Sequence, residues 1–568
     1  MTEDQHNSII EKFAYIGISC YFAEATVLKV SFKEDKKSYH FNVYLDECFP
    51  ESFPLIQISE DDFNGISKPL PHVYGNHYIC VFDKTTSIPD YNNPVDLIVT
   101  TVSYARDIFL SGLHEDNRKD FIDEIASYWE LDSNHCCKIK VHSFVCRMQT
   151  VHTISIFRKT SDIRRSRLLI ADNSATMRTI LSHMVDGMRA IGDIGRRDLI
   201  NGLYVPLKRA IYPPFPETNL DWYNIIQSFA KDDTIYRAFV SKHLEDGAYI
   251  LLSIPLDNDK KFLFMIKHTP TVPLVRNGFR KGKFPAKWAF LHGKSQNVVK
   301  YKVEDLSHSR LFRRGGMGRK TGMNDIGIIG IGSLGSYLAK GLAEYGVTKL
   351  SLIDEDVINP ENIARHLCGY KYLYRPKVNA VMQELTCHEP SMDISDFQMT
   401  GEKYLHDYLV NVNQMECLFI AAADWKLERL IYRMRCEGAL KIPVIVLWVE
   451  PYCLAGHALI IQTQQDVQRI LFDESLRFKY CTINNADSQF RREGGCQSTF
   501  IPYSAFEIRR FVYTFLHYFI VNFVDKKKQG NYSYTWCGEL SKAQSLGCKL
   551  MPIYQEMDDY TEYVKRFD

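Results

Sequence analysis

Several signals that would define a simple class of protein are missing from this chain of 568 residues. Its 69 Lys and Arg residues balance 68 Asp and Glu residues, so no net field draws the whole protein toward nucleic acid or an anionic membrane. No apolar run approaches 18 residues, and the first residues lack the basic start and apolar core of a secretory signal. We therefore expect an intracellular protein that binds neither nucleic acid nor a membrane.

The cysteines follow neither a disulfide pattern nor a zinc pattern. There are 15 of them, an odd number, and no two are spaced as C-x-x-C. This spacing argues against a disulfide framework and against a four-thiolate zinc site. Reduced thiols are expected, so a reactive cysteine has to be identified from its neighbours.

The composition is that of an ordinary globular protein that can build full-sized cores. Hydrophobic residues make up 45% of the chain and charged residues 24%. At about 150 residues per domain, this length predicts three or four domains rather than one. Changes in pattern along the chain favour three domains in an α/β multidomain protein: residues 1–133, residues 134–300 and residues 301–568.

The hydrophobic pattern predicts the main elements of the first two domains. In the first, a helix over residues 5–16 precedes strands over residues 24–32, 38–45 and 55–59, and helices follow over residues 95–110 and 117–131. In the second, strands are expected over residues 138–144, 153–158, 248–254 and 262–266, and helices over residues 174–189 and 222–244. The first domain is therefore an α+β unit with an antiparallel meander, and the second is a mixed α/β linker domain without recognisable chemistry.

The strongest signal is a glycine loop in the third domain. A short apolar strand over residues 325–330 runs directly into Gly330-x-Gly332-x-x-Gly335 and a helix that reaches about Tyr345. Glycines let the backbone turn tightly and approach a phosphate, whose charge is met by free N–H groups and the positive end of the helix dipole. A second strand ends at Asp354, where a carboxylate can bind ribose hydroxyls. This order of elements predicts a Rossmann-like nucleotide site.

Charged residues after the loop indicate phosphoryl chemistry rather than hydride transfer. Arg365 and Lys377 can neutralise a triphosphate. Asp424 follows another buried strand, over residues 419–423, and can hold Mg²⁺. ATP and Mg²⁺ are therefore the expected ligands, and nucleotidyl transfer is the expected reaction.

This pattern resembles the adenylation domain of ubiquitin-activating enzymes and of their ThiF- and MoeB-type bacterial relatives, which activate ThiS- and MoaD-type sulfur carriers. The resemblance covers about residues 309–503. Besides the glycine loop, it implies nucleotide-binding roles for Asp354, Asn362, Arg365, Lys377 and Asp424, with Arg365 also catalytic. It further implies that one arginine just upstream reaches the nucleotide across a homodimer, the candidates being Arg310, Arg313 and Arg314. The zinc-binding C-x-x-C pairs of many bacterial relatives are absent.

An adenylated carboxyl terminus has to be captured by a nucleophile, and a thiolate is suitable because the thioester stays activated. Cys496 is the candidate, since it lies in the stretch RREGGCQST, where nearby arginines favour a thiolate. By the same resemblance it matches the crossover-loop cysteine of activating enzymes, in a loop near residues 480–500. Cys481 is the reserve candidate.

The first domain supplies a second cysteine. The sequences FNVYL at residues 41–45 and FPESFP at residues 49–54 resemble a strand and proline turn of ubiquitin-conjugating enzymes. Leu70-Pro71-His72 stands where that family has His-Pro-Asn, and Cys80 follows His72 at the family's spacing to its catalytic cysteine. The departure is His for Asn: His72 can donate a hydrogen bond to a developing oxyanion or, alternatively, deprotonate the incoming amine.

A conjugating-like domain, a linker domain and an activating-like domain in this order resemble the bacterial CD-NTase-associated protein 2 family of antiphage CBASS operons. The resemblance implies a cytoplasmic bacterial enzyme, a ubiquitin-like protein transferase that adenylates the C-terminal tail of a cGAS/DncV-like nucleotidyltransferase with ATP. The tail would pass to Cys496 and Cys80 as thioesters and then to an amine of a target protein. Two alternatives stay open: a ThiS/MoaD-type sulfur-carrier adenylyltransferase, in which Cys80 would be dispensable, and a catalytically dead scaffold that binds a partner's tail.

Overall fold

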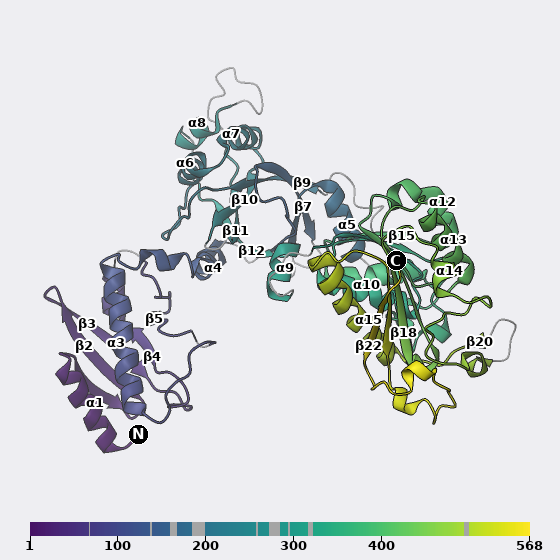
Figure 1. Ribbon diagram of the computed structural model, residues 1–568. Coiled ribbons are helices and arrows are strands. Elements are labelled where there is room, and N and C mark those ends of the chain that lie inside the picture. The colour runs from purple at the N-terminus through teal and green to yellow at the C-terminus, as the bar shows by residue number, and fades with distance from the viewer. Residues whose placement is uncertain are drawn as a thin grey trace. The chain divides into compact units, whose positions relative to one another are not determined.

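The computed structural model describes residues 1–568 except 67–68, 84, 137–138, 160–166, 185–198, 257–259, 272–283, 293–295, 316–321 and 493–498. The chain forms two compact units: the first comprises residues 1–177 and 194–306, and the second comprises residues 178–193 and 307–568. Figure 1 shows a small antiparallel sheet and a barrel in the first unit, and one large sheet flanked by helices in the second.

A five-stranded antiparallel sheet begins the first unit, with its strands in chain order from β1 to β5. Alternate residues of β2, namely Leu28, Val30 and Phe32, are buried and pack with Phe109 of α3 in one core cluster. The elements are α1 (Glu3–Tyr15), β1 (Ser19–Glu24), β2 (Val27–Glu34), β3 (Lys37–Tyr44), β4 (Leu55–Ile58), α2 (Glu60–Asn64), β5 (Tyr78–Ile79) and α3 (Pro94–Leu113). The expected α+β meander is therefore present.

Seven strands then form a closed barrel, in the order β10-β11-β12-β6-β8-β7-β9. Neighbouring residues of β10 enter two cores: Leu251 packs with Tyr204 and Met265 of other strands, whereas Leu252 joins a cluster that includes Trp222 of α6. The elements are β6 (Lys140–Ser143), β7 (His152–Lys159), β8 (Arg167–Ala171), α5 (Ser174–Met184), β9 (Leu199–Pro206), α6 (Asn219–Phe229), α7 (Asp233–Lys242), β10 (Ala248–Pro255), β11 (Lys261–His268), α8 (Ala286–His292) and β12 (Val299–Asp305).

A short 3₁₀ turn, η1 (Arg118–Phe121), and helix α4 (Ile125–Cys136) connect the sheet to the barrel along the chain. Their apolar residues Phe121, Ile125 and Trp129 belong to the same core cluster as the barrel strands β9, β10 and β11. Helix α4 therefore packs as part of the barrel core, although it lies within the range expected for the first domain.

The second unit contains an eight-stranded sheet in the order β15-β14-β13-β16-β17-β18-β21-β22. The first five strands are parallel, and the last three are joined antiparallel. Residues of α10, α11 and α15 pack in one core cluster, and residues of α12, α13 and α14 pack in another. Both clusters also contain residues of β13, which is typical of a doubly wound sheet covered on both faces.

The bounds of these elements are as follows: α9 (His308–Gly315), β13 (Asp325–Ile329), α10 (Ser333–Tyr345), β14 (Lys349–Ile353), η3 (Pro360–Asn362), η4 (Tyr370–Tyr372), α11 (Lys377–His388), β15 (Asp393–Phe397), α12 (Gly401–Val412), β16 (Cys417–Ile420), α13 (Trp425–Cys436), β17 (Val444–Val449), η5 (Pro451–Cys453), β18 (Ala455–Ile461) and α14 (Val467–Leu471). They continue with η6 (Ala486–Gln489), β19 (Arg491–Arg492), β20 (Thr499–Phe500), α15 (Ala505–Phe519), η7 (Ile520–Asp525), β21 (Tyr532–Cys537), η8 (Leu540–Lys542), η9 (Pro552–Tyr554) and β22 (Glu562–Arg566).

Some of the expected elements need correction. The helix expected over residues 117–131 is divided into η1 and α4. The helix expected over residues 222–244 is two helices, because Ala230 is extended and the side chain of Asp232 caps the start of α7. The expected domain boundary at residue 300 falls inside β12, which pairs with β11 and β6 in the barrel. The sequence pattern did not predict strands β1, β5, β8, β9 and β12 of the first unit or strands β15, β17, β18, β19, β20, β21 and β22 of the second.

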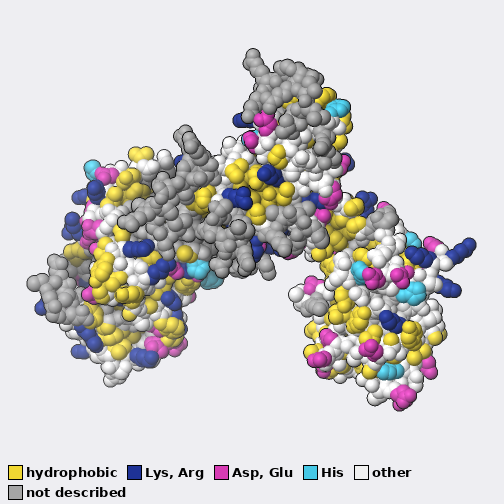
Figure 2. All heavy atoms as spheres, turned by 180° about the vertical axis from the view of Figure 1, so that it is seen from behind, with side chains coloured by type: hydrophobic (Ala, Val, Ile, Leu, Met, Phe, Trp, Pro, Cys, Tyr) yellow, Lys and Arg dark blue, Asp and Glu magenta, His cyan; other side chains and the backbone are white. Residues whose placement is uncertain are grey.

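On the face drawn in Figure 2, basic and acidic side chains are interspersed rather than gathered by sign. This distribution agrees with the balance of 69 basic and 68 acidic residues. Among the described helices, none combines the length and the apolar character that crossing a bilayer requires.

Candidate nucleotide and transfer sites

The carboxyl ends of three parallel strands meet at the glycine loop. Ile329 at the end of β13 pairs with Ile353 of β14 on one side and with Ile420 of β16 on the other. The loop leaves β13 at this point, Asp354 directly follows β14, and Asp424 lies four residues after the end of β16. The fold therefore brings residues that are far apart in sequence to one edge of the sheet, where open α/β sheets bind their ligands.

The three loop glycines serve different purposes. Gly330 has φ +89°, and a Cβ there would lie 2.5 Å from the backbone N of Ala422. A Cβ on Gly335 would lie 1.8 Å from the carbonyl oxygen of Gly330, so both glycines are required by packing within the fold. A Cβ on Gly332 would meet no atom within 4 Å among the described residues. The open space above Gly332, which is the N-cap of α10, is where a phosphate can approach the helix.

Asp354 ties the glycine loop to the next strand. Its Oδ2 accepts a hydrogen bond from the N–H of Ile331 at 2.7 Å, and its Oδ1 accepts one from the N–H of Asp356 at 2.9 Å. Lys377 is buried at the start of α11, with its Nζ 2.7 Å from Asp356 Oδ2 and 3.8 Å from Asp354 Oδ1. A buried ammonium is thus held beside the loop by two carboxylates.

Arg365 and its neighbours lie on the segment between β14 and α11. Asn362 Oδ1 accepts a hydrogen bond from the N–H of Asn359 and thereby closes the short turn η3. Arg365 Nη1 donates to the hydroxyl of Tyr503 at 3.1 Å, and its buried Nε has no hydrogen-bond partner among the described residues. His366 Nε2 donates to the carbonyl of Ile331 at 2.9 Å, so this segment also contacts the glycine loop.

Burial lowers the pKa of His366, so its ring is neutral at ordinary pH and its Nδ1 accepts from the N–H of Cys368. The ring is therefore a fixed spacer between the segment and the loop. Neither His366 nor Tyr503 was identified from the sequence. Tyr503 is 138 positions from Arg365, and only the fold shows that they meet.

Asp424 is the N-cap of α13. Its Oδ1 accepts hydrogen bonds from the N–H groups of Lys426 at 2.8 Å and Leu427 at 3.4 Å. The residue is exposed, so its carboxylate can reach a ligand at the strand ends. An unpartnered guanidinium nitrogen, a buried ammonium and an exposed carboxylate around an open glycine turn suit a triphosphate with a divalent cation.

The upstream arginines lie on α9, where Arg310 is partly buried and Arg313 is exposed. The side chain of Arg314 lies outside the described residues.

Cys496 lies in residues 493–498 and thus outside the described part of the chain. The flanking residues form a two-stranded ladder in which Arg491 pairs with Phe500 and Arg492 pairs with Thr499. The reserve candidate Cys481 is half-buried, and burial raises the pKa of its thiol more than a nearby arginine lowers it. A raised pKa makes Cys481 a poor thiolate at neutral pH.

In the first unit, Cys80 directly follows β5 and is half-buried. Its N–H donates to the carbonyl oxygen of His72 at 2.8 Å, so the eight-residue spacing closes a turn. His72 has φ +63°, a left-handed conformation that is uncommon for a residue with a side chain. The two predicted residues are therefore joined through the backbone.

The His72 ring contacts two carboxylates that the sequence did not indicate. Its Nδ1 lies 3.0 Å from Glu124 Oε1 and its Nε2 lies 3.1 Å from Asp120 Oδ2. The hydrogen bond to Glu124, together with both negative charges, raises the pKa of His72 although burial opposes the charged form. Tyr74 was also missed: its hydroxyl donates to Glu124 Oε1 at 3.1 Å, and burial together with the nearby Glu124 and Cys80 raises its pKa.

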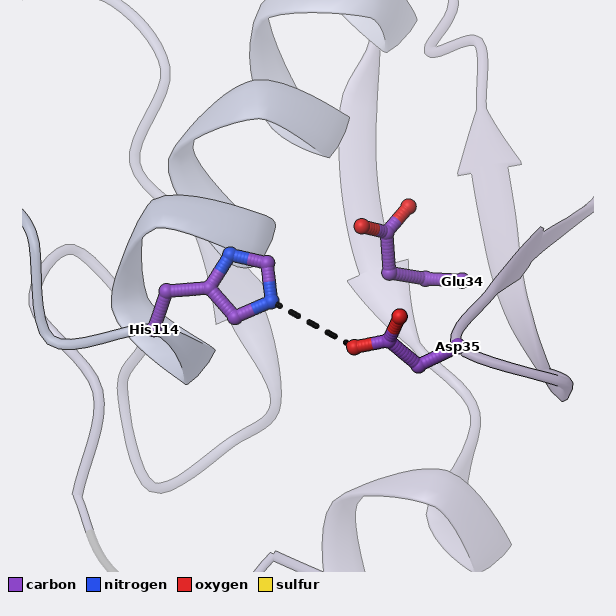
Figure 3. Close-up of side chains that lie close together, drawn as sticks. All are labelled: Glu34, Asp35 and His114. Atoms are coloured by element: carbon purple, nitrogen blue, oxygen red, sulfur yellow. Dashed lines mark ion pairs between the residues drawn. The ribbon is translucent and has the colours of Figure 1, made fainter.

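A separate cluster of metal-ligand atoms lies elsewhere in the first unit (Figure 3). Glu34 ends β2, Asp35 lies in the turn after it, and His114 follows α3. His114 Nε2 is 3.9 Å from Asp35 Oδ2. The cluster is largely exposed, and exposed acidic groups of this kind are common without an ion, so we assign no metal to it.

With this geometry in place, the class of the second unit can be stated. Residues 311–477 match the model of the ThiF family. The matched range contains the glycine loop, Asp354, Asn362, Arg365, Lys377 and Asp424. The predicted fold class is confirmed: the protein is a mixed α/β multidomain chain whose C-terminal region is a Rossmann-like domain of ThiF type.

Among curated proteins, the chain is similar to the ATP-dependent ubiquitin transferase-like protein Cap2 of Pseudomonas aeruginosa, with 24% identity over 186 residues. The similar region is 32% of this chain and 33% of that protein, so the chain spans about a third of its relative's length. This similarity agrees with the resemblance of the sequence to the CD-NTase-associated protein 2 family.

Two solved structures are similar in part. PaaA is 15% identical, with a TM-score of 0.29 over 44% of this chain and 65% of that one. Escherichia coli MccB with MccA-N7isoASN is 14% identical, with a TM-score of 0.31 over 45% of this chain and 67% of that one.

Proposed function

We propose that this chain activates the C-terminal carboxylate of a protein with ATP, carries it as a thioester on two cysteines in turn, and joins it to an amine of a target protein. The activating step is assigned to the ThiF-type region and the final transfer to the Cys80 site. We retain the division into an activating domain, a conjugating-like domain and a domain between them, with the last boundary moved to about residue 306 because β12 belongs to the barrel.

The observation that carries the proposal is the meeting of three strand ends at the glycine loop. Nucleotide-binding candidates from four separate segments converge there, whereas a purely structural glycine turn needs none of them. Gly332 in particular has no packing role that would exclude a side chain, which favours a role in admitting a phosphate. The ThiF match over residues 311–477 and the name of the Cap2 relative agree with ATP-dependent activation.

The proposed reaction proceeds in balanced steps. A carboxylate oxygen of the substrate tail attacks the α-phosphorus of ATP, an acyl adenylate forms, and pyrophosphate leaves. The thiolate of Cys496 then attacks the acyl carbon and AMP leaves. The thiolate of Cys80 attacks that thioester and releases the Cys496 thiolate. Finally, a neutral amine attacks the acyl carbon, its nitrogen loses a proton to solvent, an amide forms and the Cys80 thiolate leaves.

Residues of this chain supply charge and position in the first step. Arg365 and Lys377 would hold the phosphates through their cationic groups, and Asp354 would bind the ribose. Asp424 would hold Mg²⁺, which when bound neutralises charge on the phosphates and polarises the reacting phosphorus. The position of Asp424 supports this role, because it follows β16 at the edge of the sheet where the glycine loop lies and its exposed carboxylate can reach a ligand there.

The partners rest on the resemblance alone. We propose a cGAS/DncV-like nucleotidyltransferase as the source of the tail, a homodimer as the working form, in which an upstream arginine reaches the partner's nucleotide, and the bacterial cytoplasm as the location. The ThiS/MoaD-type alternative uses only the ThiF-type region. The ordered surroundings of Cys80, with His72, Tyr74 and Glu124, favour the full relay over that alternative and over a scaffold without activity.

Pyrophosphate exchange into ATP tests the activating step. The full chain with Mg²⁺ and a purified cGAS/DncV-like nucleotidyltransferase from the same genome should exchange labelled pyrophosphate into ATP. Asp424→Asn should lose exchange by at least about a hundredfold, because Asn preserves the helix cap but cannot supply the negative charge. Binding of a fluorescent ATP analogue, measured without partner, reports the same site independently of the tail.

Asp466 offers a matched control, because its side chain caps α14 just as that of Asp424 caps α13. Asp466→Asn should exchange at the wild-type rate. Unchanged exchange in Asp424→Asn would refute the metal assignment. Exchange without any protein conjugate would favour the sulfur-carrier alternative, and ATP binding without exchange would favour the scaffold.

A further inference from the structure

One carboxylate organises the loop that faces Cys80. Glu124 directly precedes α4, and its Oε2 accepts a hydrogen bond from the backbone N–H of His72 at 3.2 Å. Its Oε1 accepts from the His72 ring at 3.0 Å and from the Tyr74 hydroxyl at 3.1 Å. The hydroxyl of Tyr128 lies 3.5 Å from Oε2 and donates to the Leu70 carbonyl at 2.9 Å. Glu124 therefore holds both the backbone and the side chains of the segment before Cys80.

The His72 ring is held at both nitrogens. With Nδ1 directed at Glu124 and Nε2 directed at Asp120, a doubly protonated ring satisfies both carboxylates. Such a ring has no lone pair with which to accept a proton from an amine, and both of its donors already have acceptors. The left-handed φ of +63° is kept in place by these contacts, and it aims the His72 carbonyl at the Cys80 N–H.

Helix α4 is in turn fixed in the barrel core. Trp129 is 1% exposed and its Nε1 donates to the carbonyl of Tyr301 in β12 at 2.9 Å. Its ring packs against those of Phe215, Trp222 and Phe264. The start of α4 therefore cannot shift relative to the barrel without breaking a buried aromatic cluster.

We propose that Glu124 is the positioning residue of the Cys80 site and that the barrel, through α4, is the support on which that site is held. In this proposal the His72 ring forms ion pairs with Glu124 and Asp120, and the His72 carbonyl accepts the hydrogen bond from the Cys80 N–H. His72 therefore positions the Cys80 backbone and acts neither as the base nor as the oxyanion donor. The domain between the two catalytic regions is thus part of the transfer site rather than a passive connection. This inference rests on the proposed function for its consequence in catalysis, but not for its geometry.

Glu124→Gln is the variant that tests the device. Glutamine keeps one acceptor oxygen and removes the charge, and it places an NH₂ donor against the donors of His72 or Tyr74. The N–H of Cys80 should then exchange with solvent deuterium at least about tenfold faster, as the loss of a charge-assisted hydrogen bond implies. Amides in β2 and β3 should exchange as in the wild type, which shows that the unit is folded.

Glu130 is the matched control, because it lies on the same helix and pairs with Lys302 of the barrel away from His72. Glu130→Gln should leave Cys80 exchange unchanged. Trp129→Phe keeps an aromatic ring but loses the hydrogen bond to β12, and it should speed Cys80 exchange by a smaller factor. Equal exchange of Cys80 in the wild type and in Glu124→Gln would overturn the positioning role, and no effect of Trp129→Phe would overturn the role of the barrel.

A second readout distinguishes this device from a general structural effect. The groups that face the His72 ring are Glu124 before α4 and Asp120 in η1, and Tyr74 on the same loop as His72 donates to Glu124. A proton NMR titration, with the His72 signal identified by its loss in His72→Gln, should place the His72 pKa above 6.5 in the wild type and lower in Glu124→Gln. An equal pKa in both proteins would contradict the ion-paired arrangement.

The catalytic consequence is measured last. Loading of Cys80 should stay within about twofold in Glu124→Gln, whereas discharge to a free amine should slow by about tenfold. If the wild type forms no thioester, the proposed function fails while the exchange and titration results still decide the inference. If thioesters form and Glu124→Gln discharges at the wild-type rate, the function stands and the inference is wrong.

Discussion

The candidate nucleotide site at the carboxyl ends of β13, β14 and β16, called the nucleotide edge below, and the Cys80 site are built in opposite ways. At the nucleotide edge, Asp354 directly follows a strand and Lys377 and Asp424 lie at the starts of helices, and parallel pairing of β13, β14 and β16 brings their strand ends together. At the Cys80 site, the loop from Leu70 to Cys80 is ordered by turn hydrogen bonds, and the His72 ring within it is held by two carboxylates, one from η1 and one directly before α4. At a sheet edge, strand pairing itself positions the side chains. In a loop site, the side chains are positioned by contacts with elements far along the chain.

The difference decides where each site is sensitive. Substitutions at the nucleotide edge should act locally, on the ligand or on the strand ends. Substitutions in the barrel, at some distance in sequence from Cys80, should act on the transfer step, because α4 transmits them.

The largest effects come from the two thiols. We propose that the adenylate forms at the glycine loop of the second unit, to which Cys496 also belongs. Cys496→Ala should therefore keep pyrophosphate exchange and lose every thioester. Cys80→Ala should keep a thiol-sensitive adduct on Cys496 and lose only the conjugate. Non-reducing gels with partner and ATP measure both.

Cys481→Ala is the control for this pair, because the raised pKa of Cys481 predicts no loss of thioester. If Cys496→Ala still loads Cys80 at the wild-type rate, the acyl group passes directly from the adenylate to Cys80 and the relay is wrong. The acyl adenylate would then react with Cys80 without a Cys496 thioester as an intermediate.

The second prediction concerns the ion pairs of Lys300 in the barrel strand β12, one of which is formed with Asp132 of α4. Lys300 is fully buried, and its Nζ lies 2.6 Å from Asp132 Oδ2 and 2.8 Å from Glu217 Oε1. Replacing both carboxylates by alanine strands a buried ammonium and should destabilise the first unit by about 3–5 kcal/mol. Lys300→Met should be nearly neutral, because both carboxylates retain access to water.

Thermal unfolding measured by circular dichroism checks this asymmetry. We also expect the double alanine variant to slow discharge of Cys80 while leaving pyrophosphate exchange intact. Loss of exchange in that variant would contradict the view that the barrel supports only the transfer site.

How far the sequence predicts these sites follows the same division. The glycine loop, Asp354 and Asp424 could be found because each follows a strand that the hydrophobic pattern predicts, and parallel order then fixes their neighbours. Glu124 could not be found, because it lies 52 positions from His72 and meets it only where α4 packs on the barrel. The barrel was itself missed, since β8, β9 and β12 gave no pattern that distinguishes a barrel strand from another buried segment.

The third prediction separates the glycines of the nucleotide loop. Gly335→Ala should destabilise the second unit by about 3 kcal/mol, because its Cβ would lie 1.8 Å from the Gly330 carbonyl oxygen. The Cβ of Gly332→Ala would lie more than 4 Å from every atom of the described residues, so this variant should stay within about 0.5 kcal/mol of the wild type in thermal stability. It should nevertheless weaken binding of the fluorescent ATP analogue by about tenfold, since a methyl group would occupy the space for a phosphate. Unchanged ATP binding in Gly332→Ala would contradict the proposal that a phosphate binds next to Gly332.

The smallest expected effect is a pH dependence that belongs to the Cys80 site and not to the nucleotide edge. The pKa of His72 is raised above its ordinary value of 6.5, chiefly by the hydrogen bond to Glu124, so its contribution to stability is complete below pH 6.5 and is lost as pH rises through the raised value. Burial opposes ionisation of Glu124, but its hydrogen bonds with His72 and Tyr74 outweigh burial and lower its pKa below 4.5. Its contribution is therefore present above pH 4.5 and is lost as pH falls through the lowered value.

The ion pair of His72 and Glu124 is therefore most stabilising between pH 4.5 and pH 6.5, where His72 is protonated and Glu124 is ionised. Within it, the coupling between His72→Gln and Glu124→Gln in a double-mutant cycle should reach about 1–2 kcal/mol, because both side chains are only partly exposed. The coupling should decline on the alkaline side, where His72 loses its proton, and on the acid side, where Glu124 gains one. Thermal midpoints of the first unit, measured from pH 4 to pH 9 for the four proteins of the cycle, give this coupling directly. A coupling that stays constant over the whole range would show that hydrogen bonding without charge holds the loop, and that His72 is neutral in the folded protein.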